Sequence, residues 1–216
     1  TVDEENVSLG LTLSERALRR VTDRPTRPHC GQHTGNGNPQ KDGFDMTTPH
    51  VSPQQALARL IAGNERFIAD TRSIHALTSS SRRDELVEGQ FPFATILTCS
   101  DSRVPVELLF DQGLGDLFVI RVAGNVVAPS LIGSVEYAAE VLGTQLVVVM
   151  GHSRCGAVKA TIDVVQGTSS VPSDNIGDIV ERIRPGIATV LNGANGHDPA
   201  EMLESAIGAN VRHSVK

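Results

Sequence analysis

The stretch Phe93-Ala-Thr-Ile-Leu-Thr-Cys-Ser-Asp-Ser-Arg103 joins a short apolar run to a polar motif. Short runs of this composition are typical of strands that are buried on both faces. The run Leu146–Met150 has the same character, and His152-Ser-Arg-Cys155 follows it closely. Functional groups in an open parallel sheet collect at the carboxyl ends of the strands. We therefore expect the two polar motifs to meet at one edge of a sheet.

The order of the remaining patterns indicates an α/β fold. Leu117–Val122 is a third apolar run, and helical patterns occupy Ser130–Leu142 and Ala157–Gln166, each closed by a glycine. Strands that alternate with helices predict parallel pairing through right-handed crossovers. We therefore expect a central, mostly parallel β-sheet that is flanked by helices.

The first 50 residues differ from the rest of the chain. Leu13–Arg24 could form one amphipathic helix, whereas Pro25–Pro49 is rich in Pro, Gly, Asn and Thr and has little to bury. We expect residues 1–50 to be an N-terminal extension that is disordered or loosely helical. Residues 51–216 should then form one domain.

Capping signals mark helices at both ends of this domain. Ser52 and Gln55 predict a capping box, with Pro53 at the first helical position. This helix should pack on the sheet or on another subunit, and its apolar stripe contains Leu57, Leu60, Ile61, Phe67 and Ile68. A later amphipathic run should stop at Pro185. Asp198-Pro-Ala-Glu201 predicts a second capping box.

Composition excludes several classes of protein. The net charge is −6 and the body carries no long basic run, which argues against nucleic acid as the main partner. No apolar run reaches the roughly 18 residues of a membrane span, and no signal-peptide pattern occurs. Three cysteines are no disulfide framework and fit thiolate ligands in a reducing compartment. We expect a soluble, cytoplasmic protein without a membrane partner.

The two polar motifs contain ligands that Zn²⁺ prefers. Cys99, His152 and Cys155 offer two thiolates and an imidazole for a tetrahedral site. Asp101 lies two residues from Arg103, so in an extended segment both side chains point to one side. Asp101 can bind zinc and close the site, or pair with Arg103 and leave one position open to water. The residues alone allow either a structural or a catalytic site.

The motifs as a set resemble those of the β-class carbonic anhydrases. The resemblance runs from about Ala56 to Lys216 and rests first on Cys99-Ser-Asp-Ser-Arg103 and Gly151-His-Ser-Arg-Cys-Gly-Ala157. Further matching segments are Gly63–Phe67, Asp111–Asp116, Phe118–Arg121, Ala123–Asn125 and Ser134–Ala138. The resemblance implies Zn²⁺ held by Cys99, His152 and Cys155, with Asp101 and Arg103 as a catalytic dyad.

The resemblance implies the reversible hydration of carbon dioxide to bicarbonate and a proton. Zinc can lower the pKa of bound water from 15.7 to about 7, so that zinc-bound hydroxide attacks the carbon. Arg103 would keep Asp101 ionised and off the metal. Two other functions stay open: hydrolysis of CS₂ or COS in a related pocket, and a non-catalytic zinc-binding module.

The resemblance also implies a substrate pocket that is shared across a homodimer or a dimer of dimers. By position, Gln90, Phe118 and Tyr137 match residues that line this pocket, and Gly156 matches a backbone amide beside the zinc-bound solvent. Gln90 could equally be a solvated residue, and the two aromatic residues could belong to the core. Arg121 could form an ion pair at the strand end or contact an anion.

The C-terminal part departs from the family pattern. Members of the family usually continue past the helix that contains Val211 to a further helix and an edge strand, whereas this sequence stops at Lys216. From the resemblance we expect a sheet that lacks this C-terminal edge strand. An unpaired strand edge would favour aggregation.

Overall fold

The computed structural model describes residues 51–71, 79–193 and 198–216. Its helices are α2 (Pro53–Ile68), α4 (Ser80–Glu85), α5 (Val106–Leu109), the 3₁₀ helix η2 (Ala123–Asn125), α6 (Pro129–Glu140), α7 (Gly156–Val165), α8 (Asp174–Gly193) and α9 (Pro199–Ser214). Its strands are β1 (Ala94–Thr98), β2 (Leu117–Arg121) and β3 (Val147–Met150). The expected N-terminal extension, residues 1–50, lies outside the described residues. Across the described ranges, no helix combines the length and apolarity that a membrane crossing requires.

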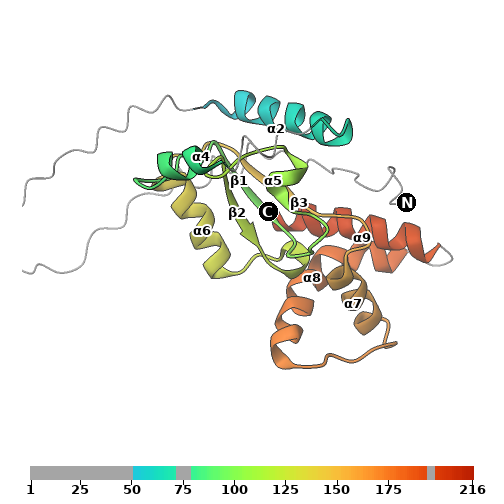
Figure 1. The fold of residues 1–216 in the computed structure, drawn as a ribbon. Coiled ribbons are helices and arrows are strands. Elements are labelled where there is room, and N and C mark those ends of the chain that lie inside the picture. Colours follow the sequence, from blue (N-terminus) through green and yellow to red (C-terminus); the bar gives the residue numbers. More distant parts are fainter. Residues whose placement is uncertain (1–50, 72–78, 194–197) are drawn as a thin grey trace, which may run out of the picture.

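Three parallel strands form the sheet of the described residues, in the order β2-β1-β3 (Figure 1). The central strand β1 is buried along its whole length, which explains its continuous apolar pattern. Thr98 at its end pairs with Arg121 on one side and with Met150 on the other. The carboxyl ends of all three strands therefore lie at one edge, as the sequence predicts.

Helices cover both faces of this sheet. Ile96 of β1 packs in a buried cluster with residues of α2 and α5. The next residue, Leu97, packs in a separate cluster with residues of α6 and α9. Because successive side chains of a strand point to opposite faces, these two clusters are the two faces of one sheet. The expected α/β fold with flanking helices is confirmed.

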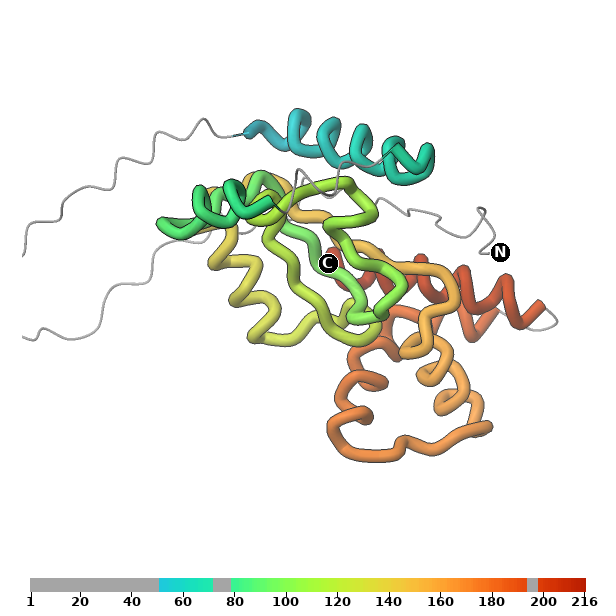
Figure 2. Tube along the Cα trace, viewed as in Figure 1, coloured from blue at the N-terminus to red at the C-terminus, as the bar shows by residue number. Residues whose placement is uncertain are grey.

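A group of three helices lies beside the carboxyl edge of the sheet. α8 packs against both α7 and α9. Cys99 and Cys155 belong to the buried cluster that these helices share. Figure 2 shows α2 at the top of the molecule and the loop between α7 and α8 at the bottom. The two cysteines therefore lie where the sheet meets the helical group.

The capping box of α2 is confirmed, and the helix docks through polar contacts. The backbone N–H of Ser52 donates to Gln55 Oε1 over 3.0 Å, and the N–H of Gln55 donates to Ser52 Oγ over 3.3 Å. Asn64 Nδ2 donates to the carbonyl of Leu109, the last residue of α5 in the connection between β1 and β2. Only part of the expected apolar stripe is buried, because Ile61 and Ile68 are 43% and 73% exposed.

Two expectations about the last helices are wrong. α8 does not stop at Pro185 but continues to Gly193. Ile183 and Ile187, on either side of this proline, are both fully buried, and their packing offsets the hydrogen bond that proline cannot donate. α9 does begin at Pro199, but the Asp198 side chain makes no capping hydrogen bond, so the second capping box is not formed.

Candidate metal centre

Three potential metal ligands meet at the carboxyl ends of two neighbouring strands. Cys99 directly follows β1, and His152 and Cys155 follow β3, which pairs with β1. Their ligand atoms all lie within 4.8 Å of one another, and all three residues are buried. Parallel pairing of β1 with β3 therefore produces the cluster that the two sequence motifs predict.

One nitrogen of His152 is left for a metal. His152 Nδ1 lies 2.9 Å from the carbonyl oxygen of Ser153. A carbonyl oxygen only accepts, so Nδ1 carries the hydrogen and Nε2 keeps its lone pair. Nε2 is buried and has no hydrogen-bond partner among the described residues. An orphaned imidazole nitrogen beside two thiols fits Zn²⁺.

The two buried cysteines share one proton in the metal-free chain. The Cys155 thiol, together with the weaker contribution of His152, lowers the pKa of Cys99 to about 3 against the effect of burial. The Cys99 thiolate and burial raise the pKa of Cys155 above its usual range. The N–H of Gly124 also donates to Cys99 Sγ over 3.3 Å. The pair therefore holds a proton that must leave before both sulfur atoms can bind a metal.

Asp101 is held by Arg103 rather than by the cluster. Arg103 Nε and Nη2 donate to the two carboxylate oxygens over 2.9 and 2.8 Å, and the Arg103 N–H donates to Oδ1 over 3.0 Å. These hydrogen bonds hold the pKa of Asp101 well below its usual range. Asp101 Oδ2 still lies 3.8 Å from His152 Nε2. Of the two options for Asp101, the structure adopts the pair with Arg103.

Arginine side chains tie the two loops of the site together. Arg121 Nε donates to the Cys99 carbonyl over 3.1 Å, and its Nη2 donates to the Asp101 carbonyl over 2.6 Å. Arg121 thus holds the backbone of the first loop, a role that differs from both sequence alternatives. Arg103 Nη2 also donates to the carbonyl of Arg154 over 3.3 Å. This bond connects the Cys99 loop to the His152 loop.

The expected pocket residues differ in their distance along the chain's elements from the cluster. Phe118 is half-buried on β2, three residues before the strand end at Arg121, which corresponds to about 10 Å along a strand. Its ring contacts that of Tyr137, with centroids 6.2 Å apart, and Tyr137 is 48% exposed. Gln90 is exposed. Gly156, by contrast, directly follows Cys155 as the first residue of α7.

The sequence did not single out Asn210, which supports the turn at Gly124, the residue whose N–H donates to Cys99 Sγ. Its side chain is buried in α9, and Nδ2 donates to the Gly124 carbonyl over 2.8 Å. Gly124 has a φ of 68°, and an added Cβ would lie 2.6 Å from Ile183 Cδ1, so only glycine fits this turn. The sequence does place the Asn210 amide next to Val211, on the apolar side of a helix, and this position could have indicated a buried polar side chain.

Comparison with known protein families gives one consistent result. The profile of the family described as "Carbonic anhydrase" matches residues 94–216. A carbonic anhydrase of Mycolicibacterium smegmatis is 47% identical over 139 residues, which cover 64% of this chain and 66% of the relative. A carbonic anhydrase of Synechococcus elongatus is 34% identical over 160 residues, which cover 70% and 58% of the two chains. The chain thus spans slightly less than two thirds of these relatives.

Solved structures agree with the fold. The β-carbonic anhydrase CcaA superposes with a TM-score of 0.56 and 30% identity, covering 73% of this chain and 71% of that chain. A Coccomyxa β-carbonic anhydrase in complex with acetazolamide gives a TM-score of 0.55, with 77% of this chain and 70% of that chain covered. Its 23% identity supports the fold alone.

Zinc uptake by the metal-free protein should release protons. The raised pKa of Cys155 keeps a proton on this thiol that must leave before the sulfur binds zinc. We expect about one proton per zinc near pH 7, and an affinity that rises with pH. Calorimetric titration in two buffers of different ionisation enthalpy counts these protons. Zinc uptake without proton release would contradict the shared-proton arrangement.

Asn210→Ala should destabilise the metal-free protein. The change leaves the buried carbonyl of Gly124 without its amide donor, which costs about 1–3 kcal/mol. Urea denaturation measures the free energy of unfolding. Asn192→Ala, which removes an exposed amide of α8, is the matched control and should change this free energy by less than about 0.5 kcal/mol. Equal losses in the free energy of unfolding for the two variants would refute the supporting role of Asn210.

Proposed function

This chain belongs to the β-class carbonic anhydrases, and on that premise we propose that it catalyses the reversible hydration of carbon dioxide to bicarbonate. Zn²⁺ would be held by Cys99, His152 and Cys155. The observation that carries the proposal is the unpartnered His152 Nε2, which lies within 4.8 Å of both sulfur atoms and 3.8 Å from the Asp101 carboxylate.

The protein supplies the ligand charge and a fixed hydrogen-bond acceptor. Zinc, when bound, supplies Lewis-acid activation of water for attack on carbon dioxide. Two thiolates place two negative charges at the site, and burial excludes competing solvent from them. His152 is held in the tautomer with a free Nε2 by its hydrogen bond to the Ser153 carbonyl.

Asp101 and Arg103 form the proposed catalytic dyad. Because Arg103 keeps the Asp101 carboxylate ionised, this group can accept a hydrogen bond from the attacking water and orient its lone pair. The bidentate pair also restrains the carboxylate from joining the metal ligands. We propose that the Gly156 N–H donates to the same solvent position, since the first N–H of a helix has no intrahelical partner.

A second copy of the chain would complete the substrate pocket. Gln90, Phe118 and Tyr137 would line this pocket across a homodimer interface, since Phe118 lies about 10 Å along β2 from the strand end at Arg121 and its ring contacts that of Tyr137. Exposed apolar side chains on α6 and at its C-cap support this assembly: Ile132, Tyr137 and the C-cap Val141 are 45%, 48% and 53% exposed. Two relatives from Sordaria macrospora are described as tetrameric, and this chain would form a dimer or a dimer of dimers.

The chemistry of the ligands favours a reducing compartment. Cys99 and Cys155 are free and must remain thiols or thiolates to bind zinc. We therefore propose the cytoplasm as the place of action.

Asp101→Ala should separate metal binding from catalysis. The variant keeps all three ligands, so it should hold one zinc per chain, while loss of the acceptor lowers kcat/KM by at least about 100-fold. Stopped-flow hydration of carbon dioxide and metal analysis measure the two properties. Asp178→Ala removes an exposed carboxylate that is bonded to Arg182 and serves as the control. Full activity of Asp101→Ala would refute the catalytic role of the Asp101–Arg103 dyad. A zinc-loaded wild type that does not hydrate carbon dioxide would refute the proposed function.

Val141→Glu should weaken self-association. A charge placed at the C-cap of α6, on the same side as Tyr137, would have to be desolvated in the proposed interface, weakening the dimer at least about fivefold. Sedimentation equilibrium of the full chain measures the dissociation constant. Val171→Glu, in the α7–α8 loop, is the control because that valine is 37% exposed and lies off α6. A wild type that stays monomeric at all concentrations would contradict the shared pocket.

A further inference from the structure

The peptide between His152 and Cys155 is held in a conformation that its residues disfavour. Arg154 has a φ of 54°, in the left-handed region that a residue with a side chain adopts at a cost. Arg154 stands directly before Cys155 and two residues after His152. A change in this φ would therefore alter the distance between the imidazole and the sulfur. Contacts from other parts of the chain have to hold this disfavoured φ of Arg154.

Both polar groups of the Arg154 backbone are bonded to distant parts of the chain. Its carbonyl accepts from Arg103 Nη2 over 3.3 Å. Its N–H donates to Glu204 Oε1 over 3.2 Å. The first bond comes from the Cys99 loop and the second from α9, 50 residues further along the chain. Glu204 therefore links α9 to the loop that carries two ligands through a hydrogen bond.

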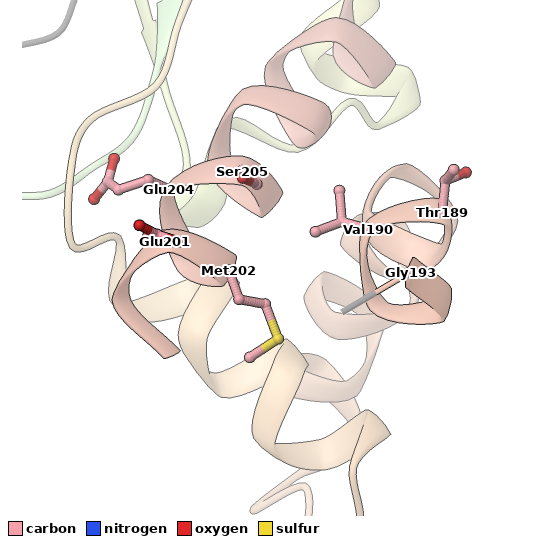
Figure 3. A pocket seen from close by; sticks show the side chains of 7 residues that line it. All are labelled: Thr189, Val190, Gly193, Glu201, Met202, Glu204 and Ser205. Carbon is pink, nitrogen blue, oxygen red and sulfur yellow. The ribbon is translucent and has the colours of Figure 1, made fainter. Parts of the chain in front are cut away.

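α9 lies close enough to this loop to act as a support. At Gly151, which precedes His152, an added Cβ would lie 2.7 Å from Val211 Cγ2 and 3.2 Å from Ile207 Cγ2. Glu204 is three residues before Ile207 and so lies on the same side of α9. In Figure 3, the Glu204 carboxylate extends from α9 away from Val190 of α8, on the other side of the helix. Glu204 is one of the residues that line a pocket between α8 and α9, and its carboxylate reaches the Arg154 N–H of the loop.

We propose that Glu204 is a positioning residue for the metal centre. Its carboxylate fixes the Arg154 peptide, and this peptide sets the spacing of His152 and Cys155. The inference rests on the proposed zinc site and extends it beyond the ligands and the dyad. Outer partners of this kind change metal affinity and metal release without contacting the ion.

Zinc release to an excess of a strong chelator tests this role. Glu204→Ala should release zinc on the order of tenfold faster than the wild type. Glu204→Gln keeps an oxygen acceptor and should release zinc at nearly the wild-type rate. Glu201→Ala removes an exposed carboxylate one turn earlier in α9 and should have no effect. The visible spectrum of the cobalt-substituted protein should change in Glu204→Ala and stay unchanged in the other two variants.

A second measurement needs no metal. The Arg154 amide proton should exchange with solvent faster in metal-free Glu204→Ala than in the metal-free wild type, because its acceptor is lost. Wild-type rates in Glu204→Ala would overturn the inference. Equal acceleration in Glu204→Ala and Glu201→Ala, or in Glu204→Gln, would also overturn it, since the effect would then be one of charge. A wild type that binds no zinc would overturn the proposed function and this inference together.

Discussion

The parallel pairing of β1 with β3 is the constraint on which the rest of the structure depends. Thr98 and Met150 are partners in this ladder, so the residues that follow each strand leave the sheet at the same edge. Cys99 is reached at once, and His152 is reached two residues after Met150. Three ligand atoms within 4.8 Å of one another result from strand register rather than from any single long-range bond. A slip of one residue would turn every inward side chain of the strand to the opposite face.

Hydrogen bonds from side chains to backbone carbonyls hold the loops around this cluster in place. Arg121 holds the carbonyls of Cys99 and Asp101, and Arg103 holds the carbonyl of Arg154. On the other side, α9 holds the Gly124 carbonyl through Asn210. These hydrogen bonds fix the loops before a metal arrives. Such a prearranged site costs little reorganisation on binding.

The strands and the ligand set could be predicted from the sequence because both depend on local patterns. Apolar runs such as Leu146–Met150 have few alternatives, and Cys99, His152 and Cys155 are uncommon residues directly after such runs. The continuation of α8 through Pro185 could not be predicted, because buried contacts of Ile183 and Ile187 outweigh a local rule. The role of Arg121 could not be predicted either. A charged residue at a strand end gives no indication in the sequence that it donates to the carbonyls of Cys99 and Asp101.

The proposed centre is a zinc ion with two sulfur ligands and one imidazole ligand, beside an Asp101 that stays paired with Arg103. X-ray absorption at the zinc edge of the loaded protein near neutral pH tests this arrangement most directly. We predict two sulfur atoms at about 2.3 Å and two lighter atoms at about 2.0–2.1 Å, with the same ligand count in Asp101→Ala. A third sulfur atom, or the loss of one light ligand in Asp101→Ala, would contradict the account.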